Sequence, residues 1–88
     1  MPPLYSSGVR YRMEPLGTEE WLGPVDIYRR RVGDCEDLVG WRVGELWLAG
    51  VAAEPHCYRP RPGLVHCQVR LGNGEIEDPS ARLGMRAP

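Results

Sequence analysis

The chain contains no lysine, no phenylalanine and no long hydrophobic run. All eleven basic residues are arginine, which we attribute to the coding bias of a GC-rich genome. The net charge of −1 lacks the basic surplus that nucleic-acid binding usually needs, so we expect no nucleic-acid partner. No stretch approaches the ~20 apolar residues that span a bilayer, and residues 1–4 lack the charged start of a signal peptide. We therefore expect a soluble protein without a membrane partner, made where thiols stay reduced.

Cysteine is scarce, with three residues at positions 35, 57 and 67. An odd number argues against a disulfide scaffold, so a free cysteine must be explained by packing or by reactivity. The 88 residues suffice for one domain, spanning residues 1–88. A domain of this size buries roughly 60–65% of its unfolded surface, which predicts a thin core.

The first third of the chain predicts short elements. Residues 1–17 mix proline, glycine and serine with scattered apolar positions, which is typical of an extended or strand-like lead-in. Residues 18–20 can cap a short helical turn at Trp21. A second helix is predicted from Pro24, with Gly33 as its stop.

The strongest helix signal runs from about residue 35 to residue 49. Asp34 is a good N-cap, Asp37 completes a shortened capping box, and Gly50 predicts the end. A broad apolar surface predicts that most of this helix is buried against a sheet, with both tryptophans packed there. Its members are Leu38, Val39, Trp41, Val43, Leu46 and Trp47.

The period then changes from helical to alternating, which predicts an antiparallel sheet over about residues 51–80. Pro55 pushes the first strand towards a sheet edge or a bulge. Helices followed by an antiparallel sheet define the α+β class. The predicted strands are 51–58, 64–71 and 75–78, joined by turns at 59–63 and 72–74 and closed by Pro79.

Cys35 takes the first position of the best helix, where unpaired backbone N–H groups and the helix dipole favour an anion. Such positions lower the pKa of a thiol below its free value of ~8.5. The alternative is a small buried core residue. The carboxylates of Asp34, Glu36 and Asp37 also oppose thiolate formation, so position alone leaves both interpretations open.

His66 lies in the middle of a strand on its less apolar face, opposite to the face of Cys67. A helix N-terminus presenting a thiol over this face would form a Cys–His pair, the usual way to activate cysteine. Asp78 on the returning strand would hold the imidazole in the required tautomer. The alternatives are a structural histidine and an N-cap or turn aspartate before Pro79.

The register of the last hairpin decides whether Asp78 reaches His66. A two-residue turn pairs Asp78 with Val69 and turns it away from His66. A three-residue loop, or a bulge, pairs Asp78 with Gln68 and places it diagonal to His66, roughly 7–8 Å away at Cα. The apolar match of Ile76 with Leu71 favours the first register, whereas the triad requires the second.

The segment Gly33-Asp34-Cys35-Glu36-Asp37 resembles the nucleophile segment of transglutaminase-like proteins, where such a stretch opens the catalytic helix. Residues 65–69 and 76–80 resemble the histidine strand and the aspartate-Pro-Ser strand of that family, in the same order. Residues 8–11 and 78–85 resemble the start and the end of small phage and prophage members.

This resemblance implies a minimal papain- or transglutaminase-like core, no cofactor, and acyl transfer on protein or peptide amides. Cys35 would be the nucleophile, His66 the general base and then acid, and Asp78 the orienting group. The Cys35 backbone N–H would be one oxyanion donor, with Trp21 or Tyr28 as candidates for the second. Release to water gives a peptidase or amidase, and release to an amine gives crosslinking. Phage or virion proteins would be partners, in the host cytoplasm or on the virion.

Other interpretations remain. A catalytically silent phage structural or adaptor protein would keep the triad without using it. The pairs His56-Cys57 and His66-Cys67 are candidate metal ligands. Adjacent strand residues face opposite ways, however, and the spacing fits no common zinc pattern, so we expect no metal site. A hairpin centred on Pro62 places Cys57 opposite Cys67. In a reducing cell we expect two thiols there, with a disulfide only in an oxidising setting.

Overall fold

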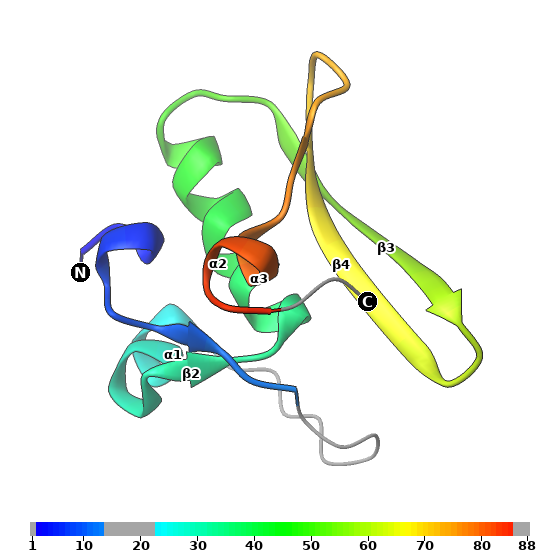
Figure 1. Ribbon diagram of the computed structural model, residues 1–88. Coiled ribbons are helices and arrows are strands. Elements are labelled where there is room, and N and C mark those ends of the chain that lie inside the picture. Colours follow the sequence, from blue (N-terminus) through cyan, green and yellow to red (C-terminus); the bar gives the residue numbers. More distant parts are fainter. Residues whose placement is uncertain (1, 14–22, 86–88) are drawn as a thin grey trace.

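A computed structural model describes residues 2–13 and 23–85 and shows a small α+β domain (Figure 1). Within these residues, a three-stranded antiparallel sheet of order β3-β4-β5 and a two-stranded parallel sheet, β1-β2, accompany the helices. No helix in the described ranges is long and apolar enough to cross a bilayer. The elements are the 3-10 helix η1 (Leu4–Ser6), β1 (Arg10–Tyr11), α1 (Pro24–Arg30), β2 (Val32–Gly33), α2 (Cys35–Leu48), β3 (Ala53–Arg61), β4 (Leu64–Leu71), β5 (Ile76–Glu77) and α3 (Pro79–Arg82).

Helix α2 forms where its capping residues predict it. The Asp37 N–H donates to Asp34 Oδ1 at 2.9 Å, and the Asp34 N–H donates to Asp37 Oδ2 at 3.2 Å, which completes the capping box. The helix ends before Gly50, whose φ of +78° lies in the left-handed region that glycine adopts without strain. The first position of α2, held by these two caps, is Cys35.

Two buried clusters flank α2, so the helix is covered on two sides. Leu38 and Trp41 pack with residues of the N-terminal elements and α3, whereas Val39 and Val43 pack on the sheet. The prediction that both tryptophans pack against the sheet is therefore wrong. Trp41 belongs to the other cluster, and Trp47 is 63% exposed, with its indole N–H donating to the Ala53 carbonyl.

Helix α1 starts at Pro24 as predicted but ends earlier than the glycine signal indicates. Arg31 terminates it in the left-handed region with φ of 64°, and its guanidinium stacks on the Tyr28 ring and donates to the Ser7 carbonyl. Gly33 is instead part of β2, which pairs in parallel with β1. The helical turn predicted at residues 18–22 lies outside the described residues. Within residues 2–13, β1 agrees with the strand-like lead-in, whereas the 3-10 helix η1 was not predicted.

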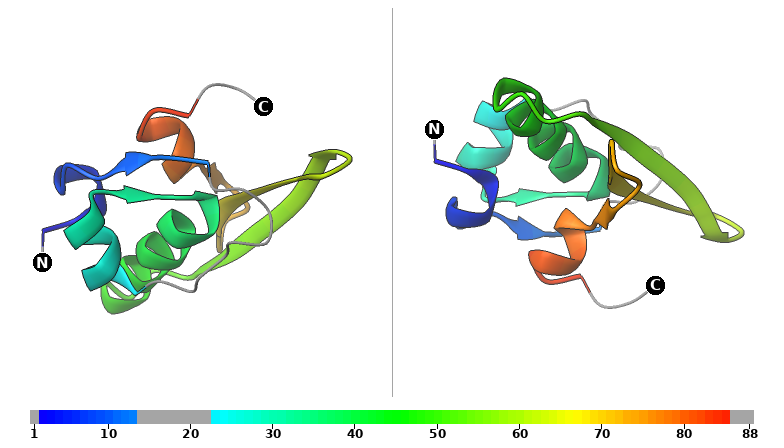
Figure 2. Two further views of the ribbon diagram at one scale, coloured as in Figure 1. Left: turned by 90° about the horizontal axis from the view of Figure 1, so that it is seen from below. Right: turned by 90° about the horizontal axis from the view of Figure 1, so that it is seen from above.

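The β3–β4 hairpin extends away from the rest of the molecule (Figure 2). Strand β3 continues through a bulge after Tyr58 as far as Arg61, so the turn predicted at 59–63 shrinks to residues 62–63. The register places Cys57 opposite Cys67, as the hairpin centred on Pro62 predicts. These two cysteines form a disulfide, so the expectation of two thiols is wrong.

The second hairpin adopts the register that the triad requires. The Leu71 N–H donates to the Glu75 carbonyl at 2.8 Å, which closes a loop of residues 72–74, and Arg70 pairs with Ile76. Continuing this pairing by two residues sets Gln68 opposite Asp78. The chain then enters α3 at Pro79, a helix that the sequence patterns did not predict. This helix packs against α2 (Figure 1).

Candidate active site

His66 and Asp78 are hydrogen-bonded. His66 Nε2 lies 2.7 Å from Asp78 Oδ2, and the histidine is only 3% exposed. Gln68, the residue opposite Asp78 in the register, donates from its side-chain amide to the same carboxylate oxygen at 3.2 Å. The sequence therefore brings together two of the three candidate residues through the loop length at residues 72–74.

The Asp78 carboxylate also caps helix α3. Its Oδ1 accepts from the Ala81 N–H at 3.1 Å, so the N-cap role and the contact with His66 use different oxygens. Burial opposes ionisation of this carboxyl, but hydrogen bonds from His66, Ala81 and Gln68 outweigh it and hold the pKa of Asp78 below its usual value. Asp78 is thus an anion fixed at both oxygens.

The edge of β4 is open beside His66. In an antiparallel strand the N–H and C=O of alternate residues point to the same neighbour, and the Leu71 N–H points to the β5 side. The Val65 carbonyl and the Cys67 N–H therefore point to that side as well. Strand β5 has ended by this level, because Pro79 has no N–H to continue the ladder and the chain turns into α3.

The Cys35 thiol occupies this vacated edge. Its Sγ lies 3.7 Å from the Val65 carbonyl oxygen, and the Cys67 N–H is directed at the same sulfur. The thiol therefore contacts the backbone on both sides of His66. Helix α2 packs on the apolar face of Cys67 and Val69 and brings its first residue to the strand edge beside His66, and the placement of the thiol over the His66 face stays a prediction.

The surroundings of Cys35 keep its thiol neutral. Burial is the largest influence and raises the pKa, and the nearby carboxylates of Asp34 and Glu36 raise it further. The backbone N–H groups of Cys67 and Glu36 act in the opposite direction but do not prevail. The favourable influence of the helix N-terminus is therefore outweighed by burial and by the carboxylates, whose opposition to the thiolate the sequence indicates.

The Cys35 thiol contacts the β4 backbone next to His66 and is not hydrogen-bonded to the imidazole. Among the residues that the structure describes, the Cys35 thiol donates to Val65, and no hydrogen bond joins it to His66. Asp78 engages Nε2, which leaves Nδ1 as the ring nitrogen that can accept a proton from the thiol.

Tyr11 is a neighbour of the site that the sequence patterns did not single out. It pairs with Gly33 in the β1–β2 ladder and packs against the cluster that contains Cys35. Burial raises its pKa, and the charges of Cys35, Asp34 and Asp78 raise it further. Its place directly beside the glycine that precedes the Asp34 cap is a long-range pairing with no local signal in the sequence.

The structure places one of the two candidates for the second oxyanion donor, Tyr28, away from Cys35. Tyr28 packs against the cluster around Leu38 and Trp41, under the Arg31 guanidinium, and not against the Cys35 cluster. Trp21 lies outside the described residues. The Cys35 backbone N–H, at the first position of α2, stays a prediction for the first donor.

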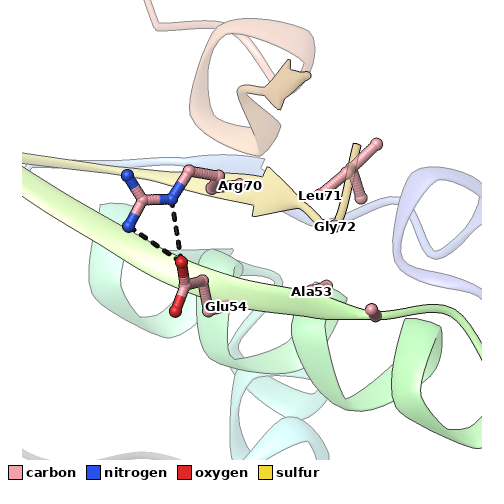
Figure 3. Close-up of a pocket in the computed structure, with 6 residues that line it drawn as sticks. Ala53, Glu54, Arg70, Leu71 and Gly72 are labelled. Atoms are coloured by element: carbon pink, nitrogen blue, oxygen red, sulfur yellow. Dashed lines mark hydrogen bonds and ion pairs between the residues drawn. The ribbon is translucent and has the colours of Figure 1, made fainter. Parts of the chain in front are cut away.

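Two surface hollows on the sheet are lined by residues within the described ranges. One of about 360 Å³ runs between β5 and α3 and includes Asp78 in its lining, together with Ile76 and Arg82. The other, of about 180 Å³, lies at the far end of β4 over Ala52 and Gly72, where Arg70 and Glu54 form an exposed ion pair (Figure 3). Only the first adjoins the candidate residues.

The described ranges contain no group of three or more His, Cys, Asp or Glu side chains placed to hold a metal ion. The two His-Cys pairs have other partners. Cys57 and Cys67 are joined to each other, His66 is bonded to Asp78, and His56 stacks on Tyr58 at a centroid distance of 6.0 Å.

Comparisons of the chain with protein-family models, with curated proteins and with solved structures found no match. The resemblance to transglutaminase-like proteins therefore rests on the sequence motifs around Cys35, His66 and Asp78.

Proposed function

We propose that this domain is a cysteine-dependent acyl-transfer enzyme acting on amides of proteins or peptides, built on a minimal papain- or transglutaminase-like core. The observation that carries the proposal is the Asp78-oriented His66 on β4, with the Cys35 thiol at the backbone on both sides of that histidine. Nucleophile, base and orienting group in this order are what amide attack by cysteine needs.

The raised pKa of the Cys35 thiol, caused first by burial, determines how the proposed reaction begins. A neutral thiol is the resting state, so His66 acts as a general base during attack rather than as the partner of a preformed thiolate. His66 Nδ1 takes the thiol proton while Asp78, ionised and held at both oxygens, stabilises the imidazolium. The same proton then goes to the leaving amine, and water or another amine releases the acyl group.

A second function is favoured by one observation. The thiol satisfies an edge carbonyl of β4 and is 9% exposed, which is what a structural cysteine does. On this alternative the domain is a catalytically silent phage or virion structural or adaptor protein. Its Cys35 would serve only to close the sheet edge.

Acylation by p-nitrophenyl acetate separates these functions. The enzyme predicts a burst of p-nitrophenolate and one acetyl group on Cys35 by mass spectrometry, followed by slow turnover. Cys35→Ser should abolish both, and Asp78→Asn should slow acylation without unfolding the domain. Acetylation of Cys35 no faster than that of free cysteine, in a protein with native circular dichroism, would favour the structural alternative.

A further inference from the structure

Three sulfur atoms share the central part of the sheet. Cys35 and Cys67 are in one buried cluster, and Cys67 is joined to Cys57 of β3 by the disulfide. Cys35 is the free cysteine of the described residues. Its thiol donates to the Val65 carbonyl, and the Cys67 N–H forms a backbone hydrogen bond to the Cys35 sulfur.

The order of these residues across the sheet is fixed by the strand pairing. Cys57 lies on β3, on one side of β4, because it pairs directly with Cys67. Cys35 lies at the opposite edge of β4, in the position that β5 vacates, where it contacts Val65. Cys67 is therefore between the two, with the Cys35 sulfur approaching from the side away from Cys57.

This order places Cys35 on the side of Cys67 from which thiol–disulfide exchange would have to start. A thiolate attacks one sulfur of a disulfide roughly along the S–S axis, and the far sulfur leaves. Exposure favours the same direction, because Cys57 is exposed to solvent whereas Cys67 is completely buried. A sulfur released at Cys57 is accordingly stabilised by water.

We infer that Cys35 has a second chemistry, intramolecular exchange with the Cys57–Cys67 disulfide. The Cys35 sulfur forms a bond to the Cys67 sulfur, the Cys67–Cys57 bond breaks, and Cys57 leaves as a thiolate. Cys35 gives up one proton and Cys57 gains one, so neither an oxidant nor a reductant is consumed. The product holds its disulfide in the core and its free thiol on the surface of the hairpin.

The exchange does not depend on the acyl-transfer reaction, but it bears on Cys35 in that role. A Cys35 bonded to Cys67 has no thiol with which to attack a substrate. Exchange with the hairpin disulfide would thus block the nucleophile. An external disulfide or alkylating agent that reacts with the exposed Cys57 thiol would prevent the reverse exchange and so keep Cys35 blocked.

Alkylation mapping of the full chain, purified without reductant, tests the inference. The native protein is incubated with iodoacetamide, quenched in acid and digested with pepsin under non-reducing conditions, so that no further exchange takes place. We expect most of the labelled molecules to carry the label on Cys57 together with a Cys35–Cys67 disulfide, because alkylation traps the exposed thiol. Label confined to Cys35, with Cys57–Cys67 intact, would overturn the inference.

Two variants make the result independent of labelling rates. Cys35→Ser has no free thiol to start the exchange and should take up no label. Cys57→Ser leaves Cys35 and Cys67 as the two thiols, and oxidation of the reduced, folded variant by diamide should join them within one chain. Failure to form that bond would show that the two sulfurs do not meet, whatever the outcome of the acetylation assay.

Discussion

Arg42 of helix α2 donates two hydrogen bonds to the carboxylate of Glu77 in strand β5. Its Nε donates to Glu77 Oε2 at 2.6 Å and its terminal nitrogen donates to Oε1 at 3.3 Å, while the Tyr5 hydroxyl donates to Oε2 at 2.6 Å. Glu77 directly precedes Asp78. The ion pair therefore fixes the end of β5 on the helix that carries Cys35, and so sets where Asp78 begins its turn towards His66.

Glu77→Gln should lower the free energy of unfolding at neutral pH by about 1.5–3 kcal/mol, because it removes the charged partner of two Arg42 hydrogen bonds and leaves this partly buried arginine with only Glu45 as its counter-charge. Glu54→Gln is the matched control, since the Glu54–Arg70 pair is 58% and 45% exposed and should cost about 0.5 kcal/mol or less. Urea titration of both variants measures the difference. Equal losses would mean that Glu77 does not anchor β5.

The same variant has a defined pH dependence. Burial opposes ionisation of Glu77, but the hydrogen bonds from Arg42 and Tyr5 prevail and hold its pKa below the usual value. A carboxyl with a lowered pKa in the folded state stabilises the fold above its unfolded pKa of about 4.3, and this contribution is lost as the pH falls through the folded value. The stability difference between wild type and Glu77→Gln should therefore shrink below about pH 4.

Two aspartate-to-asparagine changes should alter Cys35 chemistry in opposite directions. Asp78→Asn keeps an N-cap for α3 but removes the charge that stabilises an imidazolium, so acylation by p-nitrophenyl acetate should slow by about 10²–10⁴-fold. Asp34→Asn keeps the α2 cap but removes a carboxylate that raises the Cys35 pKa, so alkylation at neutral pH should become faster. Parallel effects in both assays would indicate a change in fold rather than in charge.

A glycine-to-alanine change in the 72–74 loop tests the hairpin that sets the register, and a second such change in α2 is its control. Gly74 closes the 72–74 loop with φ of +89°, so Gly74→Ala should destabilise the domain by about 1 kcal/mol. Gly40 lies in α2 with open space around an added methyl group, and Gly40→Ala should stabilise by about 0.5–1 kcal/mol. Thermal unfolding should show melting temperatures that move in opposite directions.

Local signals in the sequence predicted the elements better than their packing. The Asp34 capping box and Gly50 set the ends of α2, and the alternating pattern set β4, because caps and periods depend only on near neighbours. The sequence left the Asp78 register open, since a two-residue and a three-residue loop both suit the same glycines. The observed register comes with a long-range contact that no local pattern contains, the ion pair of Glu77 with Arg42.

The approach of Cys35 to His66 was likewise beyond local patterns. Alternation identified the apolar face of β4, and it is this face that α2 covers. The early end of β5 at Pro79 created the edge position that the thiol fills. That position depends on where α2 begins and where β5 ends beside β4, so no single stretch of sequence encodes it.

The ionisation of Tyr11 gives a measurement of how the site is assembled. Burial is the first cause of its raised pKa, and the charges of Cys35, Asp34 and Asp78 add to it. Since burial remains in a Cys35→Ala variant while the sulfur charge is lost, the pKa of Tyr11 should fall part of the way towards its ordinary value. Asp78→Asn should lower it as well, because one of the anions that raise it is removed.

Tyr5 is the internal control for this titration. Its pKa is also raised by burial, but its charged neighbours are Glu77, Arg42 and Arg82, none of which changes in either variant. Nuclear magnetic resonance of ¹³Cζ-labelled tyrosine separates the two phenols in one experiment. A Tyr11 curve that stays in place when Cys35 or Asp78 is replaced would mean that the phenol is remote from both. A shift in the pKa of Tyr11 without a shift in that of Tyr5 would show that β1 lies close to both the Cys35 thiol and the Asp78 carboxylate.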